Sequence, residues 1–467
     1  MLKLVLGTSG SGKTTLLYAR IRARAEAGKR SILLVPEQFT SSTEARIYRE
    51  LGDALSGMVE SYSFTSLAEH ILAALGGAAV QTLTDAGRAV LVRRALEELQ
   101  DNVHYYYRHR RSAAFCQMAA ETIDELKSAG LSGQQLQELA RDCGTESAKL
   151  GELALIFQGY ESLLAGTGMD PADRLELAAD RLEAALARNE LPDFLREREV
   201  FIDEFDTFNA PKKRLMGAML AALPAVTVAL CEDGAPMQPG DLELFSGAKQ
   251  VAAQLRQLAR KNGAQVAAPE LLRRDLRHKD APGLAALTEL LETGSCTPPE
   301  SAPELRLFAA ASREEEARCA AAAIRRLMRQ GVRCGKIAVV CRDISLYRAA
   351  VRYEFRMAEI PLYCDEPTTP EFSAPATAVR ALLALLRGAD MTEQLTVLAK
   401  TGLCDLTEPE VCALENYAYT WSPNAAAWRA EFTKSPRGFG DAELTEEDTL
   451  NTVSYTHLRA HETDSYL

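Results

Sequence analysis

The chain has 467 residues, of which 47% are hydrophobic and 25% charged, a composition typical of a globular protein with roughly three domains. Its formal net charge is −12, so the surface as a whole repels polyanions and any contact with nucleic acid must come from a local groove. No apolar run approaches the roughly 18 residues of a membrane span, and the ten cysteines form no C-x-x-C pair, so we expect a cytoplasmic protein without a zinc site or a disulfide framework.

A phosphate-binding sequence follows the first apolar segment. Residues 2–6 predict a buried strand, and the next residues match the pattern G-x-x-x-x-G-K-[ST] in full: Gly7, Thr8, Ser9, Gly10, Ser11, Gly12, Lys13 and Thr14, with Thr15 next. The backbone N–H groups of such a loop cradle phosphates at a helix N-terminus, the lysine reaches the β- and γ-phosphates, and the threonine binds Mg²⁺. The pattern predicts a site for ATP and Mg²⁺, and a Gly-rich turn that binds nothing is the alternative.

An acidic partner for this loop comes much later in the chain. A helix over residues 15–27 and a strand over residues 31–35 first complete a βαβ unit. An apolar strand over residues 199–202 then ends in Asp203 and Glu204, which is a Walker B pattern. Asp203 would hold Mg²⁺ and Glu204 would orient the attacking water, so both join Lys13 as predicted catalytic residues. A strand that merely ends in solvated carboxylates is the alternative.

Helical periodicity dominates the segment between the two motifs. Four stretches predict helices and hence an inserted helical domain: residues 85–99, 113–129, 132–140 and 150–164. A Pro-rich segment over residues 294–303 indicates a domain boundary. Beyond it, residues 304–308 and 336–340 predict strands on either side of a helix over residues 314–329, which would begin a second α/β unit. We therefore expect an α/β protein with a large helical insertion.

Several stretches, by their order and spacing, resemble the N-terminal portion of the AddB family. Members of this family are the B subunits of AddAB-type ATP-dependent helicase/nucleases. These enzymes are related to UvrD-class superfamily 1 helicases. Besides the phosphate loop, the resemblance rests on residues 34–40 (LVPEQFT), 61–68 (SYSFTSLA), 200–208 (VFIDEFDTF), 311–316 (ASREEE), 337–343 (IAVVCRD), 360–365 (IPLYCD) and 414–417 (LENY).

The resemblance implies a particular domain organisation. A RecA-like P-loop domain would comprise residues 1–80 and 196–293, interrupted by a helical insertion over residues 81–195. A second RecA-like domain would begin over residues 304–369, followed by a truncated helical insertion over residues 370–452. Residues 453–467 break register with the family, and we expect them to be a non-native tail.

The resemblance also implies a surface for single-stranded DNA. Gln38, Thr40, Ser63 and Phe64 stand where superfamily 1 motors touch the strand; the polar residues can bond phosphates and Phe64 can stack on a base. A core position is the alternative for Phe64. An aromatic and basic cluster over residues 105–111 (YYYRHRR) would either grip a strand or form a solvated helix edge.

The expected partners are an AddA-type helicase/nuclease subunit and double- and single-stranded DNA, in the processing of double-stranded ends for recombinational repair. The family's C-terminal nuclease with its iron–sulfur cluster lies outside the matching region, so no cysteine is assigned to it, and no adenine-binding motif precedes the phosphate loop. Two other functions stay open: a DNA-scanning scaffold whose motor is the partner protein, and a P-loop phosphotransferase that acts on a small molecule.

Overall fold

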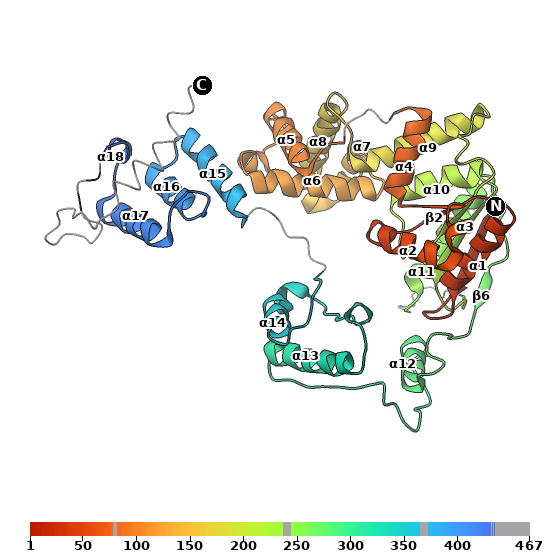
Figure 1. Ribbon diagram of the computed structural model, residues 1–467. Coiled ribbons are helices and arrows are strands. Elements are labelled where there is room, and N and C mark those ends of the chain that lie inside the picture. The colour runs from red at the N-terminus through yellow and green to blue at the C-terminus, as the bar shows by residue number, and fades with distance from the viewer. Residues whose placement is uncertain (78–81, 237–243, 365–371, 431, 433, 435–467) are drawn as a thin grey trace. The chain divides into compact units, whose positions relative to one another are not determined.

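A six-stranded parallel sheet organises the first of the two units into which the chain divides, Met1–Leu307 and Phe308–Leu467 (Figure 1). The computed structural model describes residues 1–77, 82–236, 244–364, 372–430, 432 and 434. The strands are β1 (Leu2–Gly7), β2 (Ser31–Leu34), β3 (Val59–Tyr62), β4 (Glu199–Ile202), β5 (Ala225–Cys231) and β6 (Glu270–Leu272). Their order is β3-β2-β4-β5-β1-β6, and each neighbouring pair is parallel.

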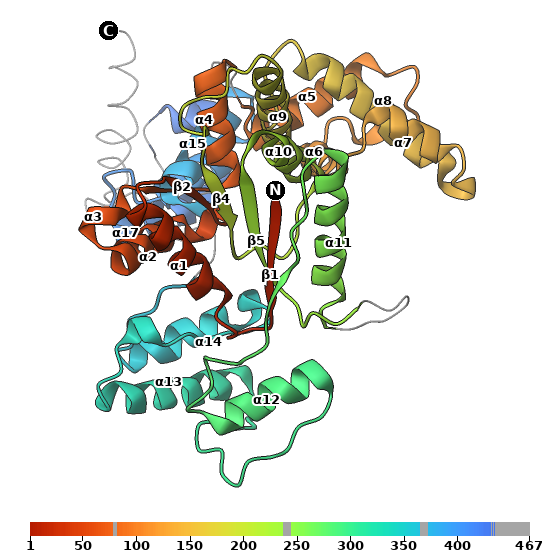
Figure 2. The same cartoon turned by 90° about the vertical axis from the view of Figure 1, so that its right-hand side faces the viewer.

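Helices cover both faces of this sheet because its strands are apolar on both sides. Val5, Leu33 and Phe201 pack against α1 (Lys13–Glu26) and α2 (Thr40–Leu51). The opposite face packs against α4 (Phe64–Leu75), α9 (Pro171–Ala187), α10 (Ala210–Ala222) and α11 (Ser246–Lys261). In Figure 2 the strands run between α1 and α2 on one side and α10 and α11 on the other. The predicted α/β class is confirmed.

A separate helical core lies between β3 and β4 in sequence. The four predicted helices are present at nearly the expected bounds, as α5 (Asp85–Glu98), α6 (Ala113–Ser128), α7 (Gly133–Ala140) and α8 (Ser147–Leu164). They enclose their own buried cluster, which includes Val92, Ile123 and Phe157. The next helix, α9, falls within the range expected for the insertion, yet it packs on α4 and α10 and its apolar residues join the core of the sheet.

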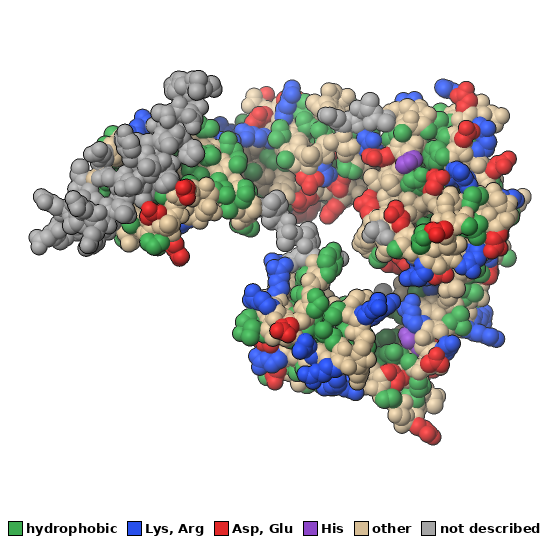
Figure 3. All heavy atoms as spheres, in the orientation of Figure 1, with side chains coloured by type: hydrophobic (Ala, Val, Ile, Leu, Met, Phe, Trp, Pro, Cys, Tyr) green, Lys and Arg blue, Asp and Glu red, His purple; other side chains and the backbone are tan. Residues whose placement is uncertain are grey.

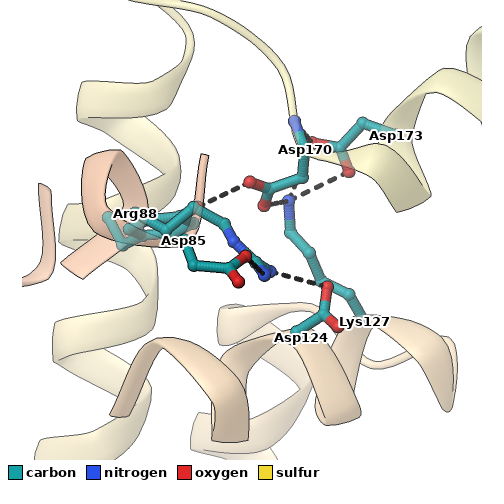
Figure 4. A network of polar contacts seen from close by, with 7 residues as sticks. Asp85, Arg88, Asp124, Lys127, Asp170 and Asp173 are labelled. Carbon is teal, nitrogen blue, oxygen red and sulfur yellow. Dashed lines mark hydrogen bonds and ion pairs between the residues drawn. The ribbon is translucent and has the colours of Figure 1, made fainter. Parts of the chain in front are cut away.

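Polar contacts join this helical core to α9 (Figure 4). The Lys127 ammonium of α6 donates to Asp170 at 2.9 Å and to Asp173 at 2.8 Å, both at the start of α9, and the Tyr160 hydroxyl donates to Asp170 at 2.6 Å. Just beyond α6, a Cβ added to Gly130 would lie 2.8 Å from the Ala210 Cβ at the start of α10. The insertion therefore meets the sheet domain through α9 and the first turn of α10.

The second unit has two small helical clusters, each described by itself. One contains α13 (Arg313–Arg329) and α14 (Ile344–Met357), packed through Ala321, Val351 and Phe355. The other contains α15 (Ala374–Leu386), α16 (Met391–Ala399), α17 (Glu408–Trp421) and α18 (Ala425–Trp428). The remaining helices of the described chain are α3 (Asp53–Ser56), α12 (Pro282–Thr293) and short 3-10 turns at Glu37–Phe39, Tyr107–His109, Gly144–Glu146 and Cys334–Lys336.

The two strands expected over residues 304–308 and 336–340 are not formed. Between residues 304 and 364 no segment makes a β-ladder, although the helix predicted between the two strands is present as α13. Leu307 and Val340 are 99% and 90% exposed, so their segments lack the neighbours that bury a strand of a parallel sheet. The prediction of strands was wrong here because apolar character alone does not supply a pairing partner.

Among the described residues, no helix is both long and apolar enough to cross a bilayer. The tail expected to be non-native, residues 453–467, lies outside the described residues, as does the end of the range 370–452.

Candidate nucleotide-binding site

The phosphate loop follows the carboxyl end of β1, where ligands of parallel α/β sheets bind. Gly10 and Gly12 take φ values of 81° and 92°, a left-handed backbone that glycine adopts without strain. The Ser11 hydroxyl donates to the Thr8 carbonyl at 2.8 Å and braces the turn from inside. A Cβ on Gly7 would lie 2.7 Å from the Leu272 carbonyl oxygen of β6, so the loop passes β6 too closely for a side chain.

The Lys13 ammonium points back into this loop. Its Nζ donates to the carbonyl oxygens of Gly7 and Thr8 at 2.7 and 2.8 Å. Burial lowers the pKa of Lys13, and the nearby Asp203 carboxylate opposes that shift. A cation held on two backbone carbonyls beside a concave turn of N–H groups is suited to bind the oxygens of a polyphosphate.

Asp203 lies at the carboxyl end of β4, and its side chain hydrogen bonds to Thr14 at the start of α1. It is only 5% exposed, and its Oδ1 accepts the Glu204 backbone N–H at 3.0 Å. Burial raises the pKa of Asp203 above the ordinary value of 3.8. The structure thus brings together the two predicted magnesium ligands from segments nearly two hundred residues apart. A hydroxyl and a carboxylate suit a Mg²⁺ ion that keeps several waters and binds phosphate oxygens.

Glu204 stands beside this pair with an unusual backbone. Its φ is 65°, a left-handed value that is uncommon for a residue other than glycine. The side chain is exposed, and both partial burial and the Asp203 carboxylate raise its pKa. Such local strain concentrates at functional sites.

The structure adds Arg277, a residue that the sequence analysis missed. The segment after β6 crosses the phosphate loop: the Leu276 N–H donates to the Gly10 carbonyl at 3.0 Å, and Arg277 Nη1 donates to Ser9 Oγ at 3.3 Å. Asp275 shapes this segment by accepting the backbone N–H groups of Arg277 and His278 at 3.0 and 3.1 Å. The sequence did offer one signal, a short apolar segment followed by several basic residues. That signal places the basic residues near the phosphate loop only if the apolar segment forms a strand that pairs with β1.

The four residues expected to contact DNA have different surroundings. Gln38 is exposed, and the Thr40 hydroxyl donates to the Glu37 carbonyl at 2.9 Å. Ser63 is buried and caps α4 by accepting the Ser66 N–H.

Phe64 is 2% exposed and packs edge-on against the rings of Phe205 and Phe208. These surroundings favour the alternative of a core position, and base stacking by Phe64 stays a prediction.

The aromatic and basic cluster over residues 105–111 is largely paired within the protein. Glu152 accepts the backbone N–H groups of residues 104–106, the Tyr106 ring stacks on Phe115, and the Arg110 guanidinium lies 3.8 Å from the centre of the Tyr107 ring. These contacts favour the structural alternative for this cluster. Across the described residues, no group of three or more His, Cys, Asp and Glu side chains is arranged to hold a metal ion.

Comparison with known proteins places the chain in one family. The family described as "ADDB, N-terminal" matches residues 4–288. A protein of Desulforudis audaxviator, named as the B subunit of an ATP-dependent helicase/deoxyribonuclease, is 32% identical over 91% of this chain and 37% of its own length. Proteins of the same name from Moorella thermoacetica and Clostridium perfringens are 31% and 26% identical over 92% and 98% of this chain, and over 38% and 40% of their own. This chain thus spans about two fifths of the length of these relatives, and it belongs to the AddB family.

Proposed function

We propose that this chain is the ATP-binding part of an AddB-type subunit in an AddAB-type helicase/nuclease that processes double-stranded DNA ends for recombinational repair. The observation that carries the proposal is the convergence of Lys13, Thr14 and Asp203 at one edge of the sheet, from segments far apart in sequence. The relatives' names state helicase and deoxyribonuclease activity of the enzyme to which they refer. An AddA-type subunit and DNA are the proposed partners.

In this proposal each residue has a defined task. The N–H groups of residues 8–14 and the Lys13 ammonium hold the phosphates, and bound nucleotide takes the place of the two carbonyls that Lys13 contacts here. Thr14 and Asp203 hold Mg²⁺, which would neutralise charge on the β- and γ-phosphates. Glu204 accepts a hydrogen bond from the attacking water and aligns it with the γ-phosphate.

Binding of ATP to the isolated chain tests the first step. We expect Lys13→Ala to lose most of the affinity for magnesium ATP, at least about tenfold, since a charge-assisted contact to phosphate is removed. Isothermal titration calorimetry measures this directly. Lys29→Ala, at an exposed position just after α1, is the matched control and should bind as the parent chain does. Equal affinity of the two variants would contradict the proposal.

The role of ATP at this site requires the complete complex. If ATP hydrolysis at this site drives movement along DNA, the substitution Lys13→Ala in the AddB-type chain removes the part of ATP-dependent unwinding by the AddAB-type heterodimer that depends on this site. If the chain is a scaffold that scans DNA, unwinding persists in the same variant. DNA-stimulated ATP hydrolysis would, in addition, exclude a small-molecule phosphotransferase.

A further inference from the structure

One part of the second unit is basic, although the chain as a whole is acidic. Residues 308–364 contain eleven Lys and Arg against six Asp and Glu, a net charge of +5 in a chain of net charge −12. Figure 3 shows blue Lys and Arg side chains over the part built from α13 and α14. A local reversal of this kind is the electrostatic footprint that a polyanion requires on an otherwise repelling surface.

Within this part, α14 carries three arginines in a single row. Arg348, Arg352 and Arg356 follow one another at intervals of four residues, and all three are exposed. Residues four apart lie on the same side of a helix, about 6 Å further along its axis. The three arginines therefore follow one flank of α14, shifting about 40° around the helix at each step.

The acidic residue of α14 lies on another flank. Glu354 is turned toward α13, where its carboxylate pairs with Arg318 at 3.0 Å and is 11% exposed. The buried residues Val351 and Phe355 face the α13–α14 core. Asp343 caps the start of the helix by accepting the Ser345 N–H at 2.9 Å. The core contacts of α14 are thus made by residues outside the arginine row, and no carboxylate of α14 lies within that row.

We propose that the arginine row of α14 binds the phosphate backbone of DNA, as a contact of the second unit that is separate from the nucleotide site. Guanidinium groups make strong hydrogen bonds to phosphate oxygens, and arginines spaced along one flank of a helix can contact successive phosphates of a linear polyanion. The inference rests on the proposed function in taking DNA as the partner. Such contacts fix the position of DNA without reading its sequence.

The test uses the complete chain of 467 residues and a short labelled DNA duplex, with affinity followed by fluorescence anisotropy over a salt titration. We expect the triple variant Arg348→Gln, Arg352→Gln and Arg356→Gln to bind at least about tenfold more weakly at moderate salt. Because each lost phosphate contact lowers the slope of log affinity against log salt by about 0.9, the slope should fall by about 2.7.

Two controls keep the result interpretable. The triple variant Arg181→Gln, Arg188→Gln and Arg196→Gln removes the same charge from exposed positions of the first unit and should keep affinity and slope. Replacing the α14 row by lysines retains its charge and should restore most of the affinity. Circular dichroism and thermal melting verify that each variant is folded.

Each outcome decides a different question. If the parent chain does not bind DNA at all, both the DNA-processing function and this inference fail. If it binds and the α14 variant equals the first-unit control, only the inference is overturned. A lysine variant as weak as the glutamine variant also overturns it, since charge would not be the cause. If the row instead attaches the chain to anionic vesicles and not to DNA, the partner is a membrane surface and the proposal is wrong.

Discussion

Asp203 shows how a residue can serve a site at a cost to the fold. Its pKa in the folded chain lies above its ordinary value of 3.8 because burial penalises the charged form. The unfolded chain then binds fewer protons than the folded chain between these two pKa values, so stability falls as pH rises through that interval and the deficit persists at neutral pH. In the proposed function this buried carboxylate would be the anionic oxygen ligand that Mg²⁺ requires.

The cost of burying the Asp203 carboxylate leads to a prediction for Asp203→Asn. We expect the variant to raise the melting temperature of the nucleotide-free chain at neutral pH, since the amide still accepts the Glu204 N–H without a buried charge. It should also lose at least about tenfold in affinity for magnesium ATP. Differential scanning calorimetry with and without magnesium ATP measures both effects. A variant that is less stable than the parent chain without nucleotide would refute the argument.

Arg277 gives a second prediction at the same scale. Because its guanidinium already lies at Ser9 of the phosphate loop, we expect it to contact bound phosphate. Arg277→Met should lose about 1.5–3 kcal/mol of binding free energy for ATP, or roughly ten- to hundredfold in affinity, with a smaller loss for AMP. The neighbouring exposed Arg274→Met serves as the control. Equal losses for ATP and AMP would show that Arg277 does not act on the distal phosphates.

Residues of the site differ in how far sequence alone could place them. Lys13 and Thr14 belong to a local motif whose backbone geometry follows from its glycines. Asp203 was recognised because an apolar strand precedes it. Arg277 was not, since its approach to the loop depends on the pairing of β6 with β1, which is a long-range contact. Phe64 was ambiguous because an aromatic residue after a strand can face either solvent or a core, and its contacts with Phe205 and Phe208, which favour the core, are distant in sequence.

Among the elements, the junction between α6 and α9 depends on one lysine. The side chain of Lys127 is 9% exposed and that of Asp170 is 2% exposed, so removing the cation leaves a buried carboxylate without its charge partner. We expect Lys127→Met to lower the free energy of unfolding by about 3 kcal/mol. Urea denaturation measures the change.

A matched variant separates this effect from general charge loss. Lys149→Met removes a lysine that is 39% exposed and pairs with Glu146 within the same segment. It should lower the free energy of unfolding far less than Lys127→Met does, because solvent screens an exposed pair. Adding Asp170→Asn to Lys127→Met should recover part of the loss, because no unpaired charge then remains. A cost of Lys127→Met no larger than that of Lys149→Met would mean that the junction is stabilised by other contacts.

The elements also show the limit of periodicity as a predictor. The helices of the insertion were predicted well because their apolar stripes and caps are local, as in the Ser112 and Ser132 caps of α6 and α7. The strands expected over residues 304–308 and 336–340 have the same apolar character as β2 and β4. Strand β2 forms ladders on both sides, to β3 and to β4, whereas the two expected strands form none. Neighbouring strands of this kind are not encoded in the sequence of the strand itself.

On the scale of the whole molecule, the residues of the candidate nucleotide site all belong to the first unit, Met1–Leu307. We expect magnesium ATP to slow amide hydrogen exchange at residues 1–40 and 199–210 and to leave α13 and α14 unchanged, because a ligand stabilises the elements that it contacts. Hydrogen-exchange mass spectrometry on the complete chain measures this. Protection of α13 and α14 by nucleotide would show that the second unit completes the site.

The close approach of Gly130 to Ala210 joins the end of α6 to the start of α10. Ala210 begins the helix that follows the loop after Asp203 and Glu204, and a Cβ at Gly130 would come within 2.8 Å of it. Only the Ala210 methyl group lies between the two backbones here, so the first turn of α10 and the end of α6 leave no room for a larger residue at position 130. The helical core over residues 85–164 is therefore joined to the loop after β4 through a single turn of α10. A substitution at Gly130 would for the same reason be felt at the start of α10, close to the loop that carries Asp203 and Glu204.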